Sequence, residues 1–244
     1  MNPELDFEKR FRLVREVIET IVLTVLMFLV IRFAVQNFNV DGTSMEPSLH
    51  NGELILVDKW TYLFHPPQRG DVIVFIAPPQ PTLDYVKRII GVPGDRITVD
   101  GINVYVDGVK LNETYVAAIN QGNNSGSIIQ NKVVPPNMYF VLGDDRIRSS
   151  DSRYWGFVPR QNIIGRAAIV YWPLKQDNNG FLPNVASVFT NVHQPGAAAN
   201  APGNDNLNVS ADAILILLAP LTLSLFMRQK SKRRRSVDSL ELHP

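Results

Sequence analysis

The sequence predicts a mostly β fold: an antiparallel exported domain that apolar helices hold at a membrane. Three observations predict it. A long apolar segment lies near the N-terminus, short runs rich in Val, Ile, Tyr and Phe follow it, and Asp-Gly pairs separate some of these runs. The chain has 244 residues, of which 45% are hydrophobic and 19% charged. It is therefore long enough to bury a sizeable core.

The two apolar segments decide the broad class. Residues 17–35 carry only Glu19 near the start and Arg32 near the end, and their length suits a bilayer core of about 30 Å. A cleaved signal peptide is the competing interpretation, but no small-residue cleavage pattern follows. Residues 211–227 form a shorter segment that contains Pro220. We expect a second span there, with a buried or membrane-surface helix as the alternative.

Positive charge at both ends predicts the topology. Residues 1–16 and residues 228–244 are both rich in Lys and Arg, and such flanks stay on the cytoplasmic side. We therefore expect two cytoplasmic tails, with residues 36–175 forming a β domain on the other side of the membrane. The net charge of +1 gives no overall basic field, which argues against a nucleic-acid partner.

Five runs are predicted as strands because β-branched and aromatic residues dominate them. They are Leu54–Val57, Asp71–Ile76, Tyr85–Ile90, Asn137–Leu142 and Ile163–Trp172.

Three further runs are separated by Asp100-Gly101 and Asp107-Gly108, which predicts a meander. This meander lies in a β-rich insertion of about residues 97–135. Residues 176–210, rich in Asn, Pro, Gly and Ala, predict a flexible linker to the second apolar segment.

Several kinds of chemistry are absent from the sequence. There is no cysteine, the four histidines form no metal-binding pair, and no phosphate-binding glycine loop occurs. A Ser-His-Asp triad would need His50 or His65, both of which lie in polar or proline-rich surroundings. We therefore expect a site without a metal or an organic cofactor.

A serine and a lysine stand out instead. Ser44 follows the first apolar segment closely; by itself it can equally be a turn-capping serine ahead of Pro47. Lysine activates a serine only when neutral, and burial lowers its pKa from about 10.4. In a strand, Lys87 faces the same side as Tyr85, while Arg88 faces the other. The alternative for Lys87 is a solvent-facing edge lysine.

Four sequence blocks combine these residues. They are Gly42–Leu49, Arg69–Phe75, Tyr85–Asp95 and Gly143–Gly156. In this order, behind an N-terminal apolar segment, they resemble bacterial type I signal peptidases. The resemblance covers roughly residues 32–172.

The resemblance implies roles for particular residues. Ser44 matches the family's nucleophile, Lys87 its general base, and Ser149 the serine that hydrogen-bonds the lysine. Four charged residues match the family's supporting network, in which we expect ion pairs: Asp144, Arg146, Asp151 and Arg153. The residues beside the nucleophile match its substrate and oxyanion region: Gly42, Thr43 and Met45.

Two positions depart from the family pattern. Asp145 stands where the family usually has Asn, which adds a negative charge near the site. Gly42 stands where some members carry a serine that helps to bind the oxyanion, so backbone N–H groups would do more of that work here.

The resemblance also implies a function. It is a membrane-bound serine endopeptidase of the bacterial cytoplasmic membrane that removes signal peptides from exported preproteins through an acyl-enzyme. Its partners would be preproteins, the lipid bilayer and, transiently, the secretion machinery. Lys59–Phe64 would lie at the membrane interface or form an ordinary packed loop. Two alternatives stay open: a LexA-like self-cleaving Ser-Lys protein, and a non-enzymatic membrane-tethered β adaptor.

Overall fold

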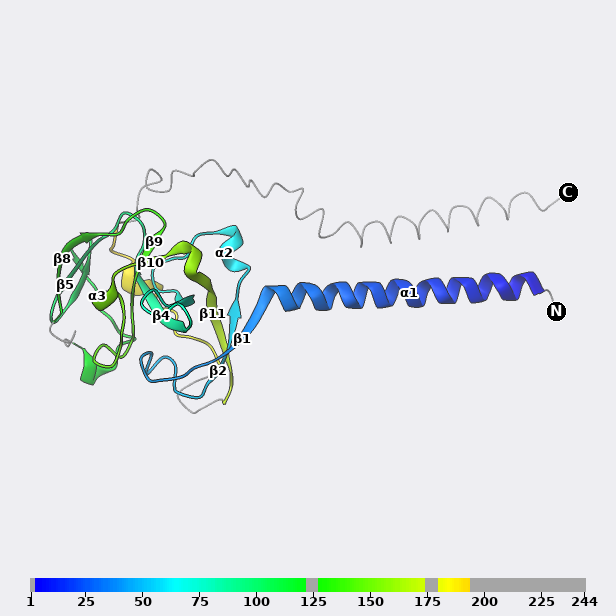
Figure 1. Cartoon of the computed structure of the whole chain (residues 1–244), viewed down its shortest axis with the longest axis horizontal. Coiled ribbons are helices and arrows are strands. Elements are labelled where there is room, and N and C mark those ends of the chain that lie inside the picture. The colour runs from blue at the N-terminus through cyan, green and yellow to red at the C-terminus, as the bar shows by residue number, and fades with distance from the viewer. Residues whose placement is uncertain (1–2, 122–126, 174–179, 194–244) are drawn as a thin grey trace. The chain divides into compact units, whose positions relative to one another are not determined.

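The structure, a computed structural model, describes residues 3–121, 127–173 and 180–193, with side chains from residue 12 onward. It begins with helix α1, Pro3–Ala34, which is drawn in blue in Figure 1. Among the described residues, its stretch Arg12–Ala34 is the one helix long and apolar enough to cross a membrane, and none of its apolar window is buried. The predicted N-terminal tail is helical from Pro3 onward. The predicted second span and basic tail, 211–244, lie outside the described residues.

A seven-stranded antiparallel sheet forms the larger part of the β domain. Its strands are ordered β1-β2-β11-β3-β4-β9-β10. Their bounds are Val35–Asn39 (β1), Leu54–Asp58 (β2), Val72–Ile76 (β3), Asp84–Gly91 (β4), Met138–Leu142 (β9), Val158–Pro159 (β10) and Ile163–Trp172 (β11). All five predicted strands are confirmed; β1 and β10 were not predicted.

A four-stranded sheet, ordered β7-β6-β5-β8, confirms the small β insertion. It consists of Arg96–Asp100 (β5), Val104–Val106 (β6), Val109–Lys110 (β7) and Ile128–Val133 (β8). In Figure 1, β5 and β8 lie at one end of the β domain and β1 and β2 at the other. Short helical turns complete the described elements: Thr61–Phe64 (α2), Ala118–Asn120 (η1), Ser152–Trp155 (α3), Arg160–Asn162 (η2) and Ala186–Phe189 (η3).

The two Asp-Gly turns of the meander differ. Asp107 and Gly108 both have positive φ, at 51° and 79°, as the sequence predicts for such a turn. At the other turn Gly101 has a positive φ of 85°, whereas the Asp100 carboxylate accepts hydrogen bonds from the N–H groups of Ile102 and Asn103. There the turn is held by a side chain because Asp readily caps the residues that follow it.

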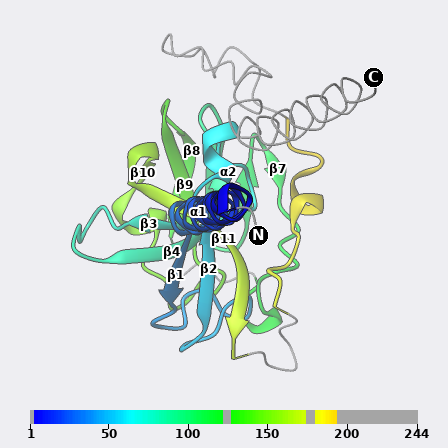
Figure 2. The ribbon, with the colours of Figure 1, turned by 90° about the vertical axis from the view of Figure 1, so that its right-hand side faces the viewer.

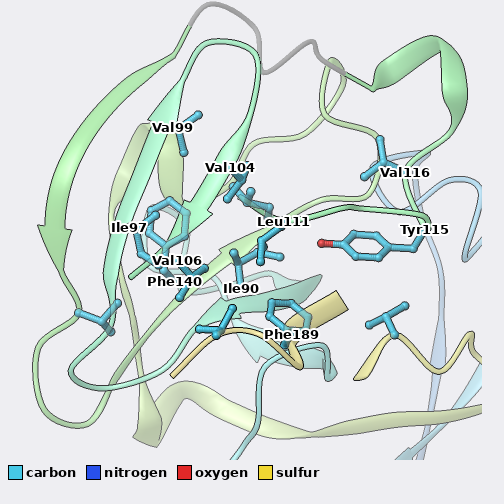
Figure 3. Packing of buried hydrophobic residues seen from close by; sticks show 14 residues of the cluster. Ile90, Ile97, Val99, Val104, Val106, Leu111, Tyr115, Val116, Phe140 and Phe189 are labelled. Atoms are coloured by element: carbon cyan, nitrogen blue, oxygen red, sulfur yellow. The ribbon is translucent and has the colours of Figure 1, made fainter. Parts of the chain in front are cut away.

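Three buried clusters form the core. One lies under the Ser44 region and includes Met45, Leu49, Ile55 and Val57. A second, which includes Ile73, Phe75 and Ile89, lies around β3 and β4. The third joins the insertion to the main sheet, and Figure 3 shows its packing.

The predicted linker is wrong for residues 180–193. Val185, Phe189 and Val192 are buried in the third cluster, and η3 lies within this stretch, which Figure 2 draws in yellow. Apolar residues spaced by four and three positions give this short turn one buried side, and the stretch contains more Val and Phe than the rest of the predicted linker. The remaining predicted linker residues, 176–179 and 194–210, lie outside the described residues.

Candidate active site

Ser44 lies in the loop of residues 40–53, which connects β1 to β2. Val40 N–H donates to Glu53 O at 2.8 Å, and Leu49 N–H donates to Met45 O at 3.0 Å. Met45 is buried in the cluster beneath the loop. The structure therefore makes Met45 a packing anchor that holds its neighbour Ser44 in place.

Lys87 is brought to Ser44 by β4, which pairs with β3 through the register Ile73–Lys87. Its Nζ donates hydrogen bonds to Ser44 Oγ at 2.7 Å and to Val86 O at 2.8 Å. Nζ also lies 5.4 Å from the centre of the Tyr85 ring, on the same face of the strand, as strand alternation predicts. The side chain is only 4% exposed, so it is not a solvent-facing edge lysine.

Burial changes the protonation of this lysine. Removal from water disfavours the ammonium and lowers the pKa of Lys87 from 10.5 to about 8, although the charges of Asp151 and Asp144 act in the opposite direction. At neutral pH the neutral fraction is then about 300-fold larger than for a free lysine. A neutral Nζ at 2.7 Å from a hydroxyl is positioned to accept its proton.

A glycine joins the fourth sequence block, Gly143–Gly156, to Ser44. Asp145 N–H donates to Ser44 O at 3.1 Å. A Cβ atom at Gly143 would collide with Ser44 O and with Ser149 Oγ. Only glycine lets the two segments approach this closely. The sequence block contains Gly143, but nothing in it indicated this contact.

The four charged residues of this block that were expected to support the site do not form a single ion-pair network. Asp144 pairs with Arg88, whose Nε and Nη2 lie 2.9 and 2.6 Å from its two carboxylate oxygens. Both side chains are buried. Arg88 therefore faces a buried acid, a partner that the sequence did not identify.

Arg146 pairs instead with Glu113 of the insertion, through contacts of 2.7 and 2.5 Å. Asp151 pairs with Arg153 and also accepts from Gly143 N–H at 3.1 Å. Arg153 Nη2 donates to Arg146 O at 2.8 Å. Three separate ion pairs are thus connected through backbone groups, and together they fix the segment that contacts Ser44.

Ser149 also lies where Gly143 meets the Ser44 segment, but it does not make the expected hydrogen bond to Lys87. Its hydroxyl is buried and, within the described part of the chain, has no hydrogen-bond partner. Lys87 makes its second hydrogen bond to Val86 O. The role that the resemblance implies for Ser149 therefore stays a prediction.

Asp145, which replaces the family's usual Asn, is satisfied by its own neighbours. Its carboxylate accepts from Asn120 Nδ2 at 3.0 Å, from the N–H groups of Ile147 and Arg148, and from Arg148 Nε at 2.8 Å. Arg148 is 63% exposed, in agreement with a solvated residue. The extra negative charge is therefore paired at the edge of the site.

A pocket of about 390 Å³ opens beside Ser44 and Lys87. Gly42 and Thr43 line it, together with apolar side chains that include Phe38, Ile55 and Val74. Gly42 has a φ of +106°, and its N–H donates to Asn51 Oδ1 at 2.8 Å. This amide is already used, so Gly42 shapes the loop and offers no donor to the pocket.

Neither histidine considered for a triad is the partner of Ser44. His50 Nδ1 lies 3.9 Å from a Glu46 carboxylate oxygen, while the nitrogen bonded to Ser44 Oγ is that of Lys87. In the part of the chain that the structure describes, no group of three or more His, Asp or Glu side chains could hold a metal ion. The expectation of a site without metal or cofactor stays a prediction.

An anchored antiparallel β domain with a serine at a pocket beside a buried lysine defines the class: the protein is a serine peptidase, a hydrolase. The model of the family "Signal peptidase, peptidase S26" matches residues 14–172. The chain therefore belongs to the signal peptidase family, peptidase S26, and its N-terminal helix makes it a membrane-anchored member.

Two curated relatives agree with this assignment. Signal peptidase I of Bacillus caldolyticus is 42% identical over 153 residues, which cover 59% of this chain and 83% of that protein. Signal peptidase I of Leptolyngbya laminosa is 38% identical over 169 residues, covering 66% and 81%. A crystal structure of a signal peptidase I from Enterococcus faecalis is 36% identical and covers 43% of this chain and 98% of that chain, with a TM-score of 0.38.

Proposed function

We propose that this protein removes signal peptides from exported preproteins, with Ser44 as nucleophile and Lys87 as general base. One observation carries the proposal: Lys87 Nζ lies 2.7 Å from Ser44 Oγ and is buried enough to lose its proton near neutral pH. The family membership supplies the substrate class.

The proposed reaction uses Lys87 in both of its stages, acylation and deacylation. Neutral Lys87 takes the Ser44 proton as Oγ attacks the scissile carbonyl carbon, and the backbone N–H of Ser44 stabilises the resulting oxyanion. The amide C–N bond then breaks, and Lys87 returns the proton to the leaving amine. Lys87 then takes a proton from a water molecule, whose oxygen attacks the ester carbonyl carbon. The bond from that carbon to Ser44 Oγ breaks, Lys87 returns the proton to Oγ, and the signal peptide leaves with a new carboxylate.

An edge of β4 offers a place for the extended peptide. β9 pairs with β4 only from Arg88 to Gly91, and within the described residues no strand pairs with Asp84–Lys87 on that side. A peptide added there would have its backbone aligned by hydrogen bonds next to Lys87. The pocket beside Ser44, about 390 Å³ in volume, would receive small side chains from it.

The membrane anchor would hold this chemistry close to the bilayer, where signal peptides are exposed. Ser44 lies ten residues after Ala34, the end of α1, which limits its reach to about 36 Å. Lys59 N–H donates to Ala34 O at 3.0 Å, so α2 starts beside the end of α1. Leu63 and Phe64 on α2 are 69% and 57% exposed. These side chains support the proposed contact of Lys59–Phe64 with the bilayer interface.

The orientation is a further part of the proposal: both termini cytoplasmic and the β domain on the outer face. Single cysteines in this cysteine-free chain test it. Ile119→Cys, at a position that is 86% exposed, should react with an impermeant thiol reagent on intact cells, and Leu240→Cys should not. External labelling of Leu240→Cys alone would remove the second span while leaving the catalytic proposal in place.

The decisive experiment incubates the purified full chain with a preprotein and sequences the new N-terminus. We expect cleavage at the signal-peptide junction, and complete loss of it in Ser44→Ala. Ser187→Ala, at an exposed serine, is the matched control and should cleave normally. Cleavage by Ser44→Ala would exclude Ser44 as nucleophile. Processing of the chain itself, with the preprotein left intact, would favour the self-cleaving alternative.

A further inference from the structure

Residues 180–193, here called the C-terminal strap, lie beyond residue 172, where the match to the family ends. The strap begins along β11: Val170 N–H donates to Gly180 O at 2.9 Å, and Phe181 forms a bridge with Ile169. It is therefore an addition to the family domain that returns to the same sheet.

The first contact of the strap is with the buried cluster that supports the Ser44 region. Leu182 packs against the cluster that contains Met45 and Leu49. Met45 is the residue that follows Ser44, and it is almost fully buried. The strap thus adds an apolar side chain to the cluster in which Met45, the neighbour of Ser44, is buried.

The second contact leads to Lys87. Gly70 has a φ of +90°, and a Cβ there would come within 2.9 Å of Val185 Cγ2 and 3.3 Å of Phe189 Cε2, so the strap lies directly against this backbone. Gly70 O accepts a hydrogen bond from Arg88 Nη1 at 2.9 Å. Arg88 is the neighbour of Lys87 in β4 and holds Asp144.

The third contact fixes the end of the strap. Arg69 Nη2 donates to His193 O at 2.9 Å, while the same guanidinium pairs with the buried Asp95 at 2.7 and 2.6 Å. Between these contacts Phe189, 5% exposed, packs in the cluster that joins the insertion to the main sheet, and in Figure 3 it lies beside Ile90.

We propose that the C-terminal strap is a positioning element of the active site, which holds the Ser44 loop through Leu182 and the Arg88–Asp144 pair through Gly70. This inference rests on the proposed roles of Ser44 and Lys87. The strap touches neither of them and acts through the residues beside them. A small displacement of reacting groups lowers the rate steeply, so support at this distance affects catalysis.

A loosened strap has a predictable effect on pH dependence. Lys87 faces Asp144, Asp151 and the Tyr85 ring, and burial is the largest influence on it. If the packing beside Arg88 loosens, water reaches Lys87 more easily, and its pKa rises toward the ordinary value. Displacement of Asp144 would act in the opposite direction but is the smaller influence.

The test measures kcat/KM against pH for the full chain and its Phe189→Ala variant. We expect kcat/KM near pH 8 to fall by about tenfold and the acid limb to move to higher pH. The matched control is Phe181→Ala, which makes the same change at a strap residue that is 67% exposed. It should keep the wild-type profile.

The midpoint of the acid limb separates positioning from simple loss of stability, since a smaller folded fraction lowers the rate without moving the midpoint. If Phe189→Ala does not fold, Phe189→Leu is tested instead, again by kcat/KM near pH 8 and by the midpoint of the acid limb. If the variant folds, its midpoint does not move and Ser44→Ala is inactive, the positioning role of the strap is wrong and the proposed function still stands. Activity of Ser44→Ala would instead overturn the proposed function itself.

Discussion

The two faces of β4 carry adjacent basic side chains in opposite electrostatic environments. Lys87 is bonded to a hydroxyl and a carbonyl, and among the described residues no carboxylate lies within ion-pair distance of it. Arg88 is bonded at two points to Asp144. Burial lowers the pKa of Lys87, whereas for Arg88 the charge and hydrogen bonds of Asp144 outweigh burial and raise the pKa. Equal burial thus yields a base on one face and a permanent cation on the other.

The largest loss of activity should come from replacing Lys87 with arginine, the residue type found on the other face of β4. Lys87→Arg keeps the positive charge and a similar length but cannot deprotonate near neutral pH. We expect preprotein cleavage to fall by about 10²–10⁴-fold, as Lys87→Ala should, because general-base catalysis is lost. A single-turnover cleavage assay compares the two variants. Near-normal activity of Lys87→Arg would make Lys87 a structural cation.

A smaller effect on activity should follow from neutralising Asp144, the partner of Arg88 on the other face of β4. Asp144→Asn leaves the buried Arg88 without its countercharge, which we expect to cost about 3–5 kcal/mol of stability. It also removes a charge that raises the pKa of Lys87, so the acid limb of activity should move to lower pH. Thermal unfolding and a pH–rate profile measure the two effects. A shift to higher pH would contradict this account of the electrostatics.

These two faces also show what the sequence can and cannot predict. Strand alternation predicted that Lys87 and Arg88 face opposite sides, and the β-branched runs predicted five strands. The partners of the buried charges were not predictable, because Asp144 lies 56 residues from Arg88 and Glu113 lies 33 residues from Arg146. Only the tertiary fold brings such pairs together.

Amino-acid composition did not predict two short segments correctly. β1, Val35–Asn39, follows the apolar helix directly and carries Gln36, Asn37 and Asn39, so its pairing with β2 had no clear signal. The strap was grouped with the Asn-, Pro-, Gly- and Ala-rich residues around it, although it contains three Val and two Phe. Its burial depends on three apolar side chains that meet the insertion. The resemblance identified Ser44 and Lys87, while Gly143 and Arg88 emerged only from the contacts in the structure.

The smallest effect is expected at Asp145. Asp145→Asn restores the family's usual residue and weakens an ion pair with the exposed Arg148, which should change stability by no more than about 1 kcal/mol. It makes the same change as Asp144→Asn one residue away, so it is the matched control for that variant. We expect an unmoved pH–rate profile, and a shift as large as that of Asp144→Asn would show that charge near the site acts without regard to position.

The central claim is that Lys87 is neutral when it acts, and the pH dependence of kcat/KM for the wild-type enzyme tests it most directly. Burial lowers the pKa of Lys87 to about 8, so kcat/KM should rise with pH through a single ionisation near that value and then level off. A rise governed by an ionisation near 10.5, the ordinary value for lysine, would contradict the account, because the group that must lose its proton would then not have the pKa that burial gives Lys87.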